Sequence, residues 1–376
     1  MRSLSFDIFC RVVDNYGDIG VCWRLAKDLA NRPDGHRVRL WVDDMASFGR
    51  IEPLIRPAFS RQRACRVEIV SWNACGEAQD KPPTPHAVVI EGFACDPPAS
   101  FVKAMQRTKS LWLNLEYLSA EEWVQGCHGL PSMHPSGLEK YFFFPGFTPT
   151  TGGLIREPGL MERCRDWQAH PERRRAMLQA LGARADTIAR LDQGAHLSFL
   201  FCYPDAPVAG LISALSRQPR PGILLVPESI HARLPLAPIP DNLSIQPVPF
   251  VDQPGFDRLL WSCDLNFVRG EDSLVRSLWA GRPMIWQIYV QEDDVHLDKL
   301  QAWLEHSPLP TSVRALMRAW NTRDAERVDT LLSELLKPPN WESWRQASRR
   351  HTGGLSALPD LTSALIAFCT QKLRTR

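Results

Sequence analysis

Short apolar runs of strand type alternate with runs of helix type along this chain, in two successive series. In the first series, strands are predicted at residues 4–13, 37–42, 66–72, 87–90, 110–115 and 141–144. In the second series, strands are predicted at residues 196–203, 223–226, 243–248, 265–268 and 284–289. Helices are predicted at residues 158–181, with Pro171 as a possible break, and at 206–216, 257–262 and 272–279. This alternation is typical of βαβ units, so the sequence predicts an α/β fold with mostly parallel sheets.

A segment rich in helix and strand breakers, residues 145–153, separates the two series. A chain of 376 residues is also too long for one core and suits two domains. We therefore predict an N-terminal Rossmann-like domain at residues 1–153 and a C-terminal one at 154–359. The last predicted helix, within residues 360–376, is expected to pack back on the first domain.

The first predicted strand leads into a turn that carries two carboxylates. Asp14 and Asp18 stand on either side of Gly17 in this turn, and a helical pattern follows from Val21 onward. Ligands of open α/β sheets bind at the carboxyl ends of strands, so this corner is a candidate site. The alternative is an ordinary turn in which Asp18 caps the helix.

A second strand–turn–helix corner contains Arg269, Gly270, Glu271, Asp272 and Ser273. Gly270 lets a ligand approach the backbone, the helix N-terminus suits a diphosphate, and Arg269 can donate to it bidentately. Glu271 could accept hydrogen bonds from ribose hydroxyls. Asp272 or Ser273 can cap the helix, and an ordinary capped helix is the alternative interpretation.

Aromatic residues precede this second corner in the sequence. Phe201 and Tyr203 alternate along one predicted strand, and Phe250 and Phe256 flank Gln253. A nucleobase could stack between such rings while Gln253 reads its edge. Core packing is the alternative, and periodicity alone favours it.

Charge and hydropathy exclude several classes of function. The 44 basic residues nearly balance the 42 acidic ones, which argues against general nucleic-acid binding. The sequence shows no signal peptide and no apolar run of about 18 residues, so neither export nor a membrane span is expected. The ten cysteines form no CxxC pair, and a reducing cytoplasmic compartment is expected. No metal-ligand spacing occurs. Two Rossmann-like domains are common to dehydrogenases and to GT-B nucleotide-sugar glycosyltransferases. The dinucleotide site of a dehydrogenase would need the motif GxGxxG, and the first corner has only Gly17 and Gly20. A GT-B glycosyltransferase is therefore the better match.

Five segments resemble, in order along the chain, the signature of the EarP family, the protein-arginine rhamnosyltransferases of elongation factor P. They are Asp14–Leu25, Asn114–Ser119, Phe201–Tyr203, Arg269–Ser273 and Gln291–Asp293. Each is short, but together they are specific. The resemblance implies a GT-B fold, with two Rossmann-like domains facing each other across a cleft. It implies inverting transfer of L-rhamnose from dTDP-β-L-rhamnose to one arginine, in a loop of the N-terminal domain of elongation factor P, without a metal or other cofactor.

The resemblance also implies roles for individual residues. Asp18 matches the family's general base, and Asp14 matches its second essential carboxylate. The residues that match the donor site are Asn15, Gly17, Phe201, Tyr203, Phe250, Gln253, Phe256, Arg269, Glu271, Asp272 and Ser273. Glu116 and Tyr117 could line the acceptor side, and packing would explain them equally well.

Two rival hypotheses stay open at this point. A GT-B enzyme that glycosylates a lipid or a sugar would share the second corner but would not need Asp14 and Asp18 together. A non-catalytic nucleotide-binding module that docks on a translation factor would bind dTDP and transfer nothing.

Overall fold

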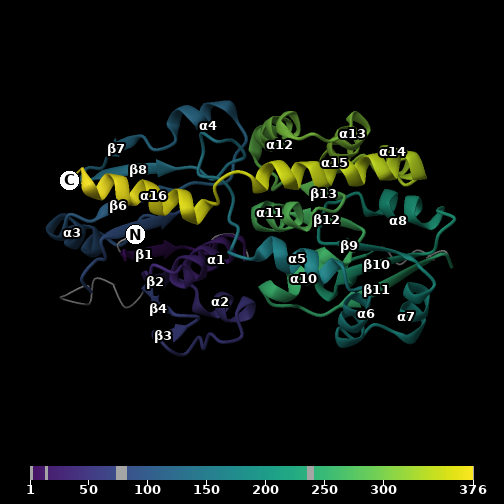
Figure 1. Cartoon of the computed structure of the whole chain (residues 1–376), viewed down its shortest axis with the longest axis horizontal. Coiled ribbons are helices and arrows are strands. Elements are labelled where there is room, and N and C mark those ends of the chain that lie inside the picture. Colours follow the sequence, from purple (N-terminus) through teal and green to yellow (C-terminus); the bar gives the residue numbers. More distant parts are fainter. Residues whose placement is uncertain (1–2, 13–15, 73–82, 235–240, 376) are drawn as a thin grey trace. The chain divides into compact units, whose positions relative to one another are not determined.

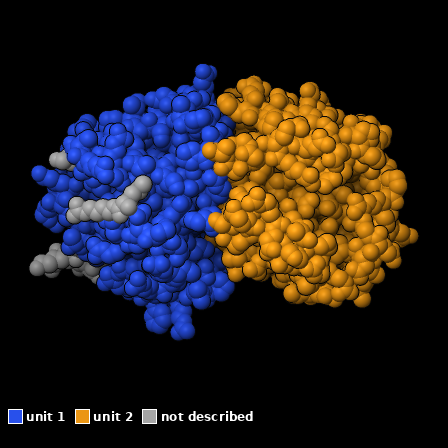
Figure 2. All heavy atoms as spheres, viewed as in Figure 1, with its two compact units in different colours: residues 1–158, 358–376 blue, residues 159–357 orange. Residues whose placement is uncertain are grey.

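The chain divides into two compact units, which are coloured separately in Figure 2. The computed structural model describes residues 3–12, 16–72, 83–234 and 241–375. Unit 1 consists of Met1–Pro158 with Leu358–Arg376, and unit 2 consists of Gly159–Ala357. The boundaries expected from the sequence follow residues 153 and 359.

Unit 1 is built on a sheet of eight strands in its described part (Figure 1). In bonding order the strands are β3 (Arg61–Ala64), β4 (Val67–Ser71), β2 (Arg37–Val42), β1 (Ser5–Cys10), β5 (Val88–Gly92), β6 (Leu111–Leu115), β8 (Glu139–Phe143) and β7 (Pro131–Met133). The inner strands are parallel, and only the edge strands β3 and β7 run antiparallel to their described neighbours. The strand order reverses at β1, which lies between β2 and β5. Open α/β sheets bind ligands at such a switch point.

The last helix of the chain belongs to unit 1. The helices of this unit are α1 (Gly17–Asn31), α2 (Met45–Ile51), α3 (Ala99–Thr108), α4 (Glu122–Cys127) and α16 (Leu361–Arg374). Helix α16, yellow in Figure 1, packs against α1 and β6. The guanidinium of Arg32, just after α1, pairs with Asp28 at 2.9 Å and with Asp360, the N-cap residue of α16, at 2.5 Å. This ion pair joins the ends of α1 and α16.

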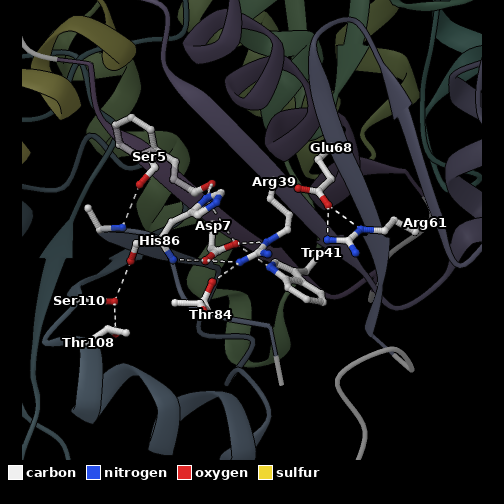
Figure 3. Close-up of polar contacts among 12 residues, drawn as sticks. Ser5, Asp7, Arg39, Trp41, Arg61, Glu68, Thr84, His86, Thr108 and Ser110 are labelled. Atoms are coloured by element: carbon white, nitrogen blue, oxygen red, sulfur yellow. Dashed lines mark hydrogen bonds and ion pairs between the residues drawn. The ribbon is translucent and has the colours of Figure 1, made fainter. Parts of the chain in front are cut away.

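A buried ion pair ties β1 to β2 in unit 1 (Figure 3). The Asp7 carboxylate accepts two hydrogen bonds from Arg39, at 2.6 and 3.0 Å. It also accepts the indole N–H of Trp41 at 2.9 Å and the backbone N–H of His86 at 2.7 Å. A buried carboxylate is costly unless it is paired and hydrogen-bonded, and here four donors serve it. The pair fixes the register of the strand that leads into the first corner.

Unit 2 is built on a sheet of five parallel strands in its described part. Their order is β11 (Leu243–Val248), β10 (Gly222–Pro227), β9 (His196–Leu200), β12 (Leu265–Arg269) and β13 (Met284–Gln287). The order reverses at β9, so the segments that follow β9 and β12 flank a switch point. The helices are α5 (Leu160–Gln168), α6 (Pro171–Ala180), α7 (Ala185–Asp192), α8 (Val208–Ser216), α9 (Glu228–His231), α10 (Gln253–Ser262), α11 (Gly270–Ala280), α12 (Val295–His306), α13 (Thr311–Asn321), α14 (Ala325–Leu335) and α15 (Pro338–Ser356), with a 3₁₀ turn at Glu292–Asp294.

Most predicted strands differ from the observed ones by one or more residues at their ends, most of all those predicted at 4–13 and 196–203, and two strands were not predicted. Strand β9 stops at Leu200 and does not reach Tyr203, because the Tyr203 N–H donates to the side chain of Gln287. Strand β1 stops at Cys10, and the N–H of Val12 donates to the side chain of Asp43. The missed strands are the edge strands β3 and β7, whose exposed, polar sequences lack the apolar pattern of a strand.

Unit 2 is expected to lose stability on mild acidification through a buried histidine. His351 on α15 is buried beside the ring of Trp303, and burial lowers its pKa to about 4. In the unfolded chain a histidine has a pKa of about 6.5, so between these values the unfolded state binds more protons. The stabilisation is therefore complete above pH 6.5 and is lost as the pH falls toward 4. Between pH 7 and pH 5 this histidine alone should cost about 2 kcal/mol.

Urea unfolding of the wild type and of His351→Leu at several pH values measures this effect. The variant should lose about 2 kcal/mol less than the wild type between pH 7 and pH 5, whatever its absolute stability. An identical pH dependence in the two proteins would contradict the assignment.

Candidate functional site

The first corner lies at the carboxyl end of β1, at the switch point of unit 1. Helix α1 begins at Gly17, with Tyr16 as its N-cap residue and Asp18 in its first turn. The interpretation of Asp18 as the helix cap is therefore wrong. Asp18 is only 8% exposed, and a carboxylate in the first turn is favoured by the helix dipole. Asp14 and Asn15 lie outside the described residues.

Neighbouring strands hold the first corner in place. Asp43, directly after β2, accepts the N–H of Val12 at 2.9 Å, so the chain leaving β1 is tied to the end of β2. Asp44 then caps α2 by accepting the N–H groups of Ala46 and Ser47 at 2.9 and 3.0 Å. Asp43 and Asp44 therefore both serve as acceptors for backbone N–H groups, and only Asp44 caps a helix.

The second corner joins β12 to α11 at the switch point of unit 2. Gly270 has φ +65°, a conformation that glycine adopts at low cost, and a Cβ there would lie 3.3 Å from Tyr203 Oη. Arg269 is the N-cap residue, so neither Asp272 nor Ser273 occupies the cap position that we predicted for one of them. Ser273 still helps to close the turn, because its Oγ accepts the N–H of Arg269 at 3.1 Å.

Arg269 is held over two aromatic rings. Its guanidinium carbon lies 4.6 Å from the centroid of the Phe201 ring and 4.7 Å from that of Tyr203. Its Nη1 donates to the carbonyl oxygen of Cys202 at 3.1 Å. A guanidinium that is stacked and hydrogen-bonded loses little further freedom when it binds an anion. The segment after β9 therefore preorganises the arginine that follows β12.

The two aromatic candidates nearest to Arg269 pack against further rings. The Phe201 ring meets the Phe256 ring edge-on at 5.4 Å, and the Tyr203 ring meets that of Tyr289 edge-on at 5.8 Å. Tyr289 was not predicted as a site residue. Phe201, Tyr203 and Phe256 are thus brought together with Arg269, and the pure core-packing interpretation is too simple because Phe201 and Tyr203 remain partly exposed.

The other donor-site candidates lie in three places. Phe250 is 62% exposed on the connection between β11 and α10, and Gln253 is the first residue of α10. Glu271 and Asp272 lie in the first turn of α11. Gly17 lies at the start of α1 in unit 1, apart in the chain from the nucleotide-site candidates of unit 2.

Gln287 is a positioning residue that the sequence reasoning missed. It is buried at the end of β13, where its Oε1 accepts the N–H of Tyr203 at 2.8 Å and its Nε2 donates to Asp205 at 3.0 Å. It therefore fixes the segment that carries both rings beneath Arg269. Its only sequence signal is a polar residue inside an apolar strand, which is weak.

A buried ion pair fixes the two helices of the second corner to each other. Arg276 on α11 donates to both carboxylate oxygens of Asp257 on α10, at 2.9 and 2.5 Å, and is 2% exposed. Helix α10 carries Gln253 and Phe256, and α11 carries Ser273. The pair therefore sets the position of one group of candidates against the other.

Arg276→Met should lower the free energy of unfolding by about 3 to 5 kcal/mol, because it leaves a buried carboxylate without its partner. Urea unfolding measures this loss. Arg175→Met is the matched control, since its pair with Asp192 is exposed on both sides and should contribute at most about 1 kcal/mol. The double variant with Asp257→Leu should recover much of the loss, and equal losses for Arg276→Met and Arg175→Met would contradict the argument.

Neither a cluster of metal-ligand type nor a membrane-spanning helix occurs among the described residues. No group of three or more histidine, cysteine or carboxylate side chains in that part of the chain is arranged to hold a metal ion. None of the helices in the same residues combines the length and the apolar character needed to cross a membrane.

Comparison with known proteins places these corners in a family. The family model described as Elongation-Factor P (EF-P) rhamnosyltransferase EarP matches residues 6–370. The chain belongs to the EarP family. A relative in this family is the protein-arginine rhamnosyltransferase of Pseudomonas putida. It is 43% identical over an aligned length of 391 residues, and the alignment covers 98% of this chain and 99% of the relative.

Solved structures agree with the EarP assignment. A structure that describes EarP-mediated arginine glycosylation of translation elongation factor EF-P is 32% identical, has a TM-score of 0.65, and aligns over 98% of this chain and 99% of its own. The glycosyltransferase-like fold is wider than the family, because MurG of Acinetobacter baumannii aligns over 98% of this chain and 99% of its own with a TM-score of 0.50 at 14% identity. The predicted α/β GT-B fold and the EarP resemblance are confirmed, and this EarP-family chain is a glycosyltransferase. The roles of individual residues stay predictions.

Proposed function

We propose that this chain transfers L-rhamnose from dTDP-β-L-rhamnose, with inversion, to one arginine in a loop of the N-terminal domain of elongation factor P. The observation that carries the proposal is the family match over residues 6–370, which spans both corners. The acceptor side is assigned to unit 1 and the donor side to unit 2. The expected compartment is the cytoplasm, where a translation factor works.

The acceptor nitrogen is a poor nucleophile, because a guanidinium keeps its protons up to a pKa above 12. An ordinary aspartate lies about 10 pKa units lower, so complete deprotonation in advance would cost roughly 13 kcal/mol. In the proposed reaction Asp14 and Asp18 orient the guanidinium by charge-assisted hydrogen bonds. Asp18 accepts the proton only as the C–N bond forms, when the nitrogen has become more acidic. The low exposure of Asp18 supports this role, since ionic contacts are stronger away from water.

The leaving group is dTDP, which departs as the bond from the anomeric carbon to its diphosphate oxygen breaks. Arg269 and the N-terminus of α11 are assigned to the diphosphate, with Gly270 allowing close approach. Asp272 and Ser273 line the same helix start, and Glu271 is assigned to the ribose. Their positions in the first turns of α11 support this assignment. These groups carry the diphosphate charge in the proposal, so no metal or cofactor is required.

The nucleobase is assigned to the aromatic segment of unit 2. Phe201, Phe256 and Phe250 supply rings for stacking, and Gln253 supplies an amide for the edge of the base. The edge-on contact of Phe201 with Phe256 supports this assignment, because it holds both rings in fixed positions before a base binds. Tyr203 is the second ring, beside Phe201, over which the Arg269 guanidinium lies.

Mass spectrometry of elongation factor P tests the proposal. Incubation with the protein and dTDP-β-L-rhamnose should add one deoxyhexose, about 146 Da, because catalysis is selective stabilisation of this one transfer. An acceptor with lysine at the modified position should gain nothing, and a chelator should leave the reaction unchanged. An unmodified acceptor would overturn the proposal, and dTDP binding without any transfer would support a non-catalytic module instead.

A further inference from the structure

A cavity of about 640 Å³ lies in unit 1, at the edge of the sheet opposite the first corner. It is lined by the start of β2, by the hairpin of β3 and β4, and by His86, which precedes β5. Strands β1, β2, β4 and β5 are parallel, and the first corner follows the carboxyl end of β1, so the amino ends of β2 and β5 meet at the other edge. The cavity is therefore apart from the first corner, and the second corner belongs to unit 2.

Charged side chains from four strands share one face of the sheet beside this cavity. In register across β1, β2, β4 and β3 stand Asp7, Arg39, Glu68 and Arg63. Residues opposite each other on paired strands project to the same face, and so do alternate residues of one strand. Arg37 and Arg61 each stand two positions from a member of this row, so they project to that face as well.

The charged row directly follows an apolar one. Two residues further along β1, β2 and β4 stand Phe9, Trp41 and Val70, which belong to the buried core that includes residues of α3. Inner strands of a parallel sheet are normally apolar on both faces, because helices cover them. The change to charged residues on three strands at once marks the place where the core ends, and such departures from the local pattern are expected at functional sites.

The cavity carries an excess of positive charge. Glu68 is the one carboxylate among its described lining residues, and it already accepts a hydrogen bond from Arg61 at 2.6 Å (Figure 3). The side chains of Arg37, Arg63 and Arg66 also line the cavity, and they make no hydrogen bond or ion pair with any described residue. Three guanidinium groups thus gather at one cavity of a chain whose formal net charge is only +2.

Two other lining residues are fixed in place. Gln62 on β3 bonds both the N–H and the carbonyl oxygen of Arg56 through its side chain, at 2.9 and 3.0 Å. His36 is 5% exposed, and its Nδ1 accepts the N–H of Leu4 at 3.1 Å, which leaves the proton of the neutral ring on Nε2. This buried Nε2 has no hydrogen-bond partner among the described residues, so the lining contains a donor that the described chain does not satisfy.

We infer that this cavity binds a small molecule that carries two or more phosphate groups. A guanidinium donates two parallel hydrogen bonds to a phosphate group, and its charge is permanent. Three such groups match the charge of a diphosphate or triphosphate, and the cavity volume lies within the range of small-molecule sites, about 300 to 1,000 Å³. The inference goes beyond the proposed function and does not depend on it, because it concerns the opposite edge of the unit 1 sheet.

Calorimetric titration with inorganic triphosphate tests the inference. The proposed donor site also takes a diphosphate, so Arg269→Gln serves as the background in every titration. This protein should bind one equivalent with a Kd of about 0.1 mM. Adding Arg63→Gln and Arg66→Gln should weaken the binding about 30-fold. Adding Glu68→Gln instead should tighten it about threefold, because the change removes the carboxylate and releases Arg61, and a damaged fold would not produce this gain.

Arg349→Gln with Arg350→Gln is the charge-matched control. Both arginines are exposed on α15 in unit 2, so their loss should change triphosphate affinity less than about twofold. Absence of binding in the Arg269→Gln background would overturn the inference, as would equal losses in the two double variants. Tighter binding of citrate than of triphosphate would overturn the phosphate assignment. Failure of the proposed function is a separate result, since it would appear as an unmodified elongation factor P and would leave these titrations unchanged.

Discussion

Asp18→Asn should lower kcat for rhamnosyl transfer about 10³-fold and leave the affinity for dTDP-β-L-rhamnose unchanged. Asparagine has nearly the shape of aspartate, so it can occupy the same almost buried position in the first turn of α1. Its amide cannot take the proton that the guanidinium nitrogen must lose, and it does not pair with a cation. The change therefore removes the chemical step and keeps the donor site, which is assigned to the other unit.

Single-turnover rates and donor titration measure the two parts separately. Asp34→Asn is the control, because Asp34 lies beyond the opposite end of the same helix and should keep full activity. Loss of the helix-dipole contact should cost Asp18→Asn less than about 1 kcal/mol of stability, which urea unfolding checks. A collapse of donor affinity would move Asp18 into the nucleotide site, and an unchanged kcat would exclude it as the base.

Arg269→Gln should reduce kcat/KM for the donor about 10³-fold, with weaker dTDP binding as part of the loss. The guanidinium is held over Phe201 and Tyr203 and bonded to the Cys202 carbonyl, so the site supplies it ready for the diphosphate. Glutamine removes the charge that stabilises the departing group. Arg269→Lys keeps a charge but loses the planar fork, so an intermediate loss of about 10²-fold is expected.

Arg258→Gln is a matched control for this experiment. Arg258 also lies over an aromatic ring, that of Trp167, with its guanidinium carbon 5.6 Å from the centroid, but it is exposed on α10. Its loss should change donor kinetics less than about threefold, since an exposed cation–π contact contributes only about 0.5 to 1 kcal/mol. If the two variants behave alike, or if Arg269→Gln binds dTDP as the wild type does, Arg269 is not the diphosphate ligand.

The central strands could be predicted because each contains its own signal. The predicted bounds of β2 and β11 agree with the structure residue for residue, and the break at Pro171 separates α5 from α6. Buried strands and breakers act locally, through apolar runs and a missing N–H. The edge strands β3 and β7 carry no such signal, because a partner on one side is enough to hold a polar, exposed segment.

The two corners of the candidate site could be predicted from the sequence, but the residues that hold them in position could not. Both strand–turn–helix corners stand where the sequence predicted them, although the residue that caps each helix differs from the prediction. Gln287 and the pair of Arg276 with Asp257 were missed. Both act through side-chain contacts with segments that their local patterns do not indicate.

The sequence by itself determined the alternation of strands and helices, the two corners and, through five short segments, the family. These features depend on residues that are close together in the chain, and local periodicity and turn chemistry express them directly. The tertiary structure alone decided the strand order, which puts the loops after β5 and β6 at the same edge of the unit 1 sheet as the first corner, and the segment after β9 beneath Arg269. Strand order is selected by packing and by hydrogen bonds between distant segments. The sequence of a single strand does not show which other strands will pair with it.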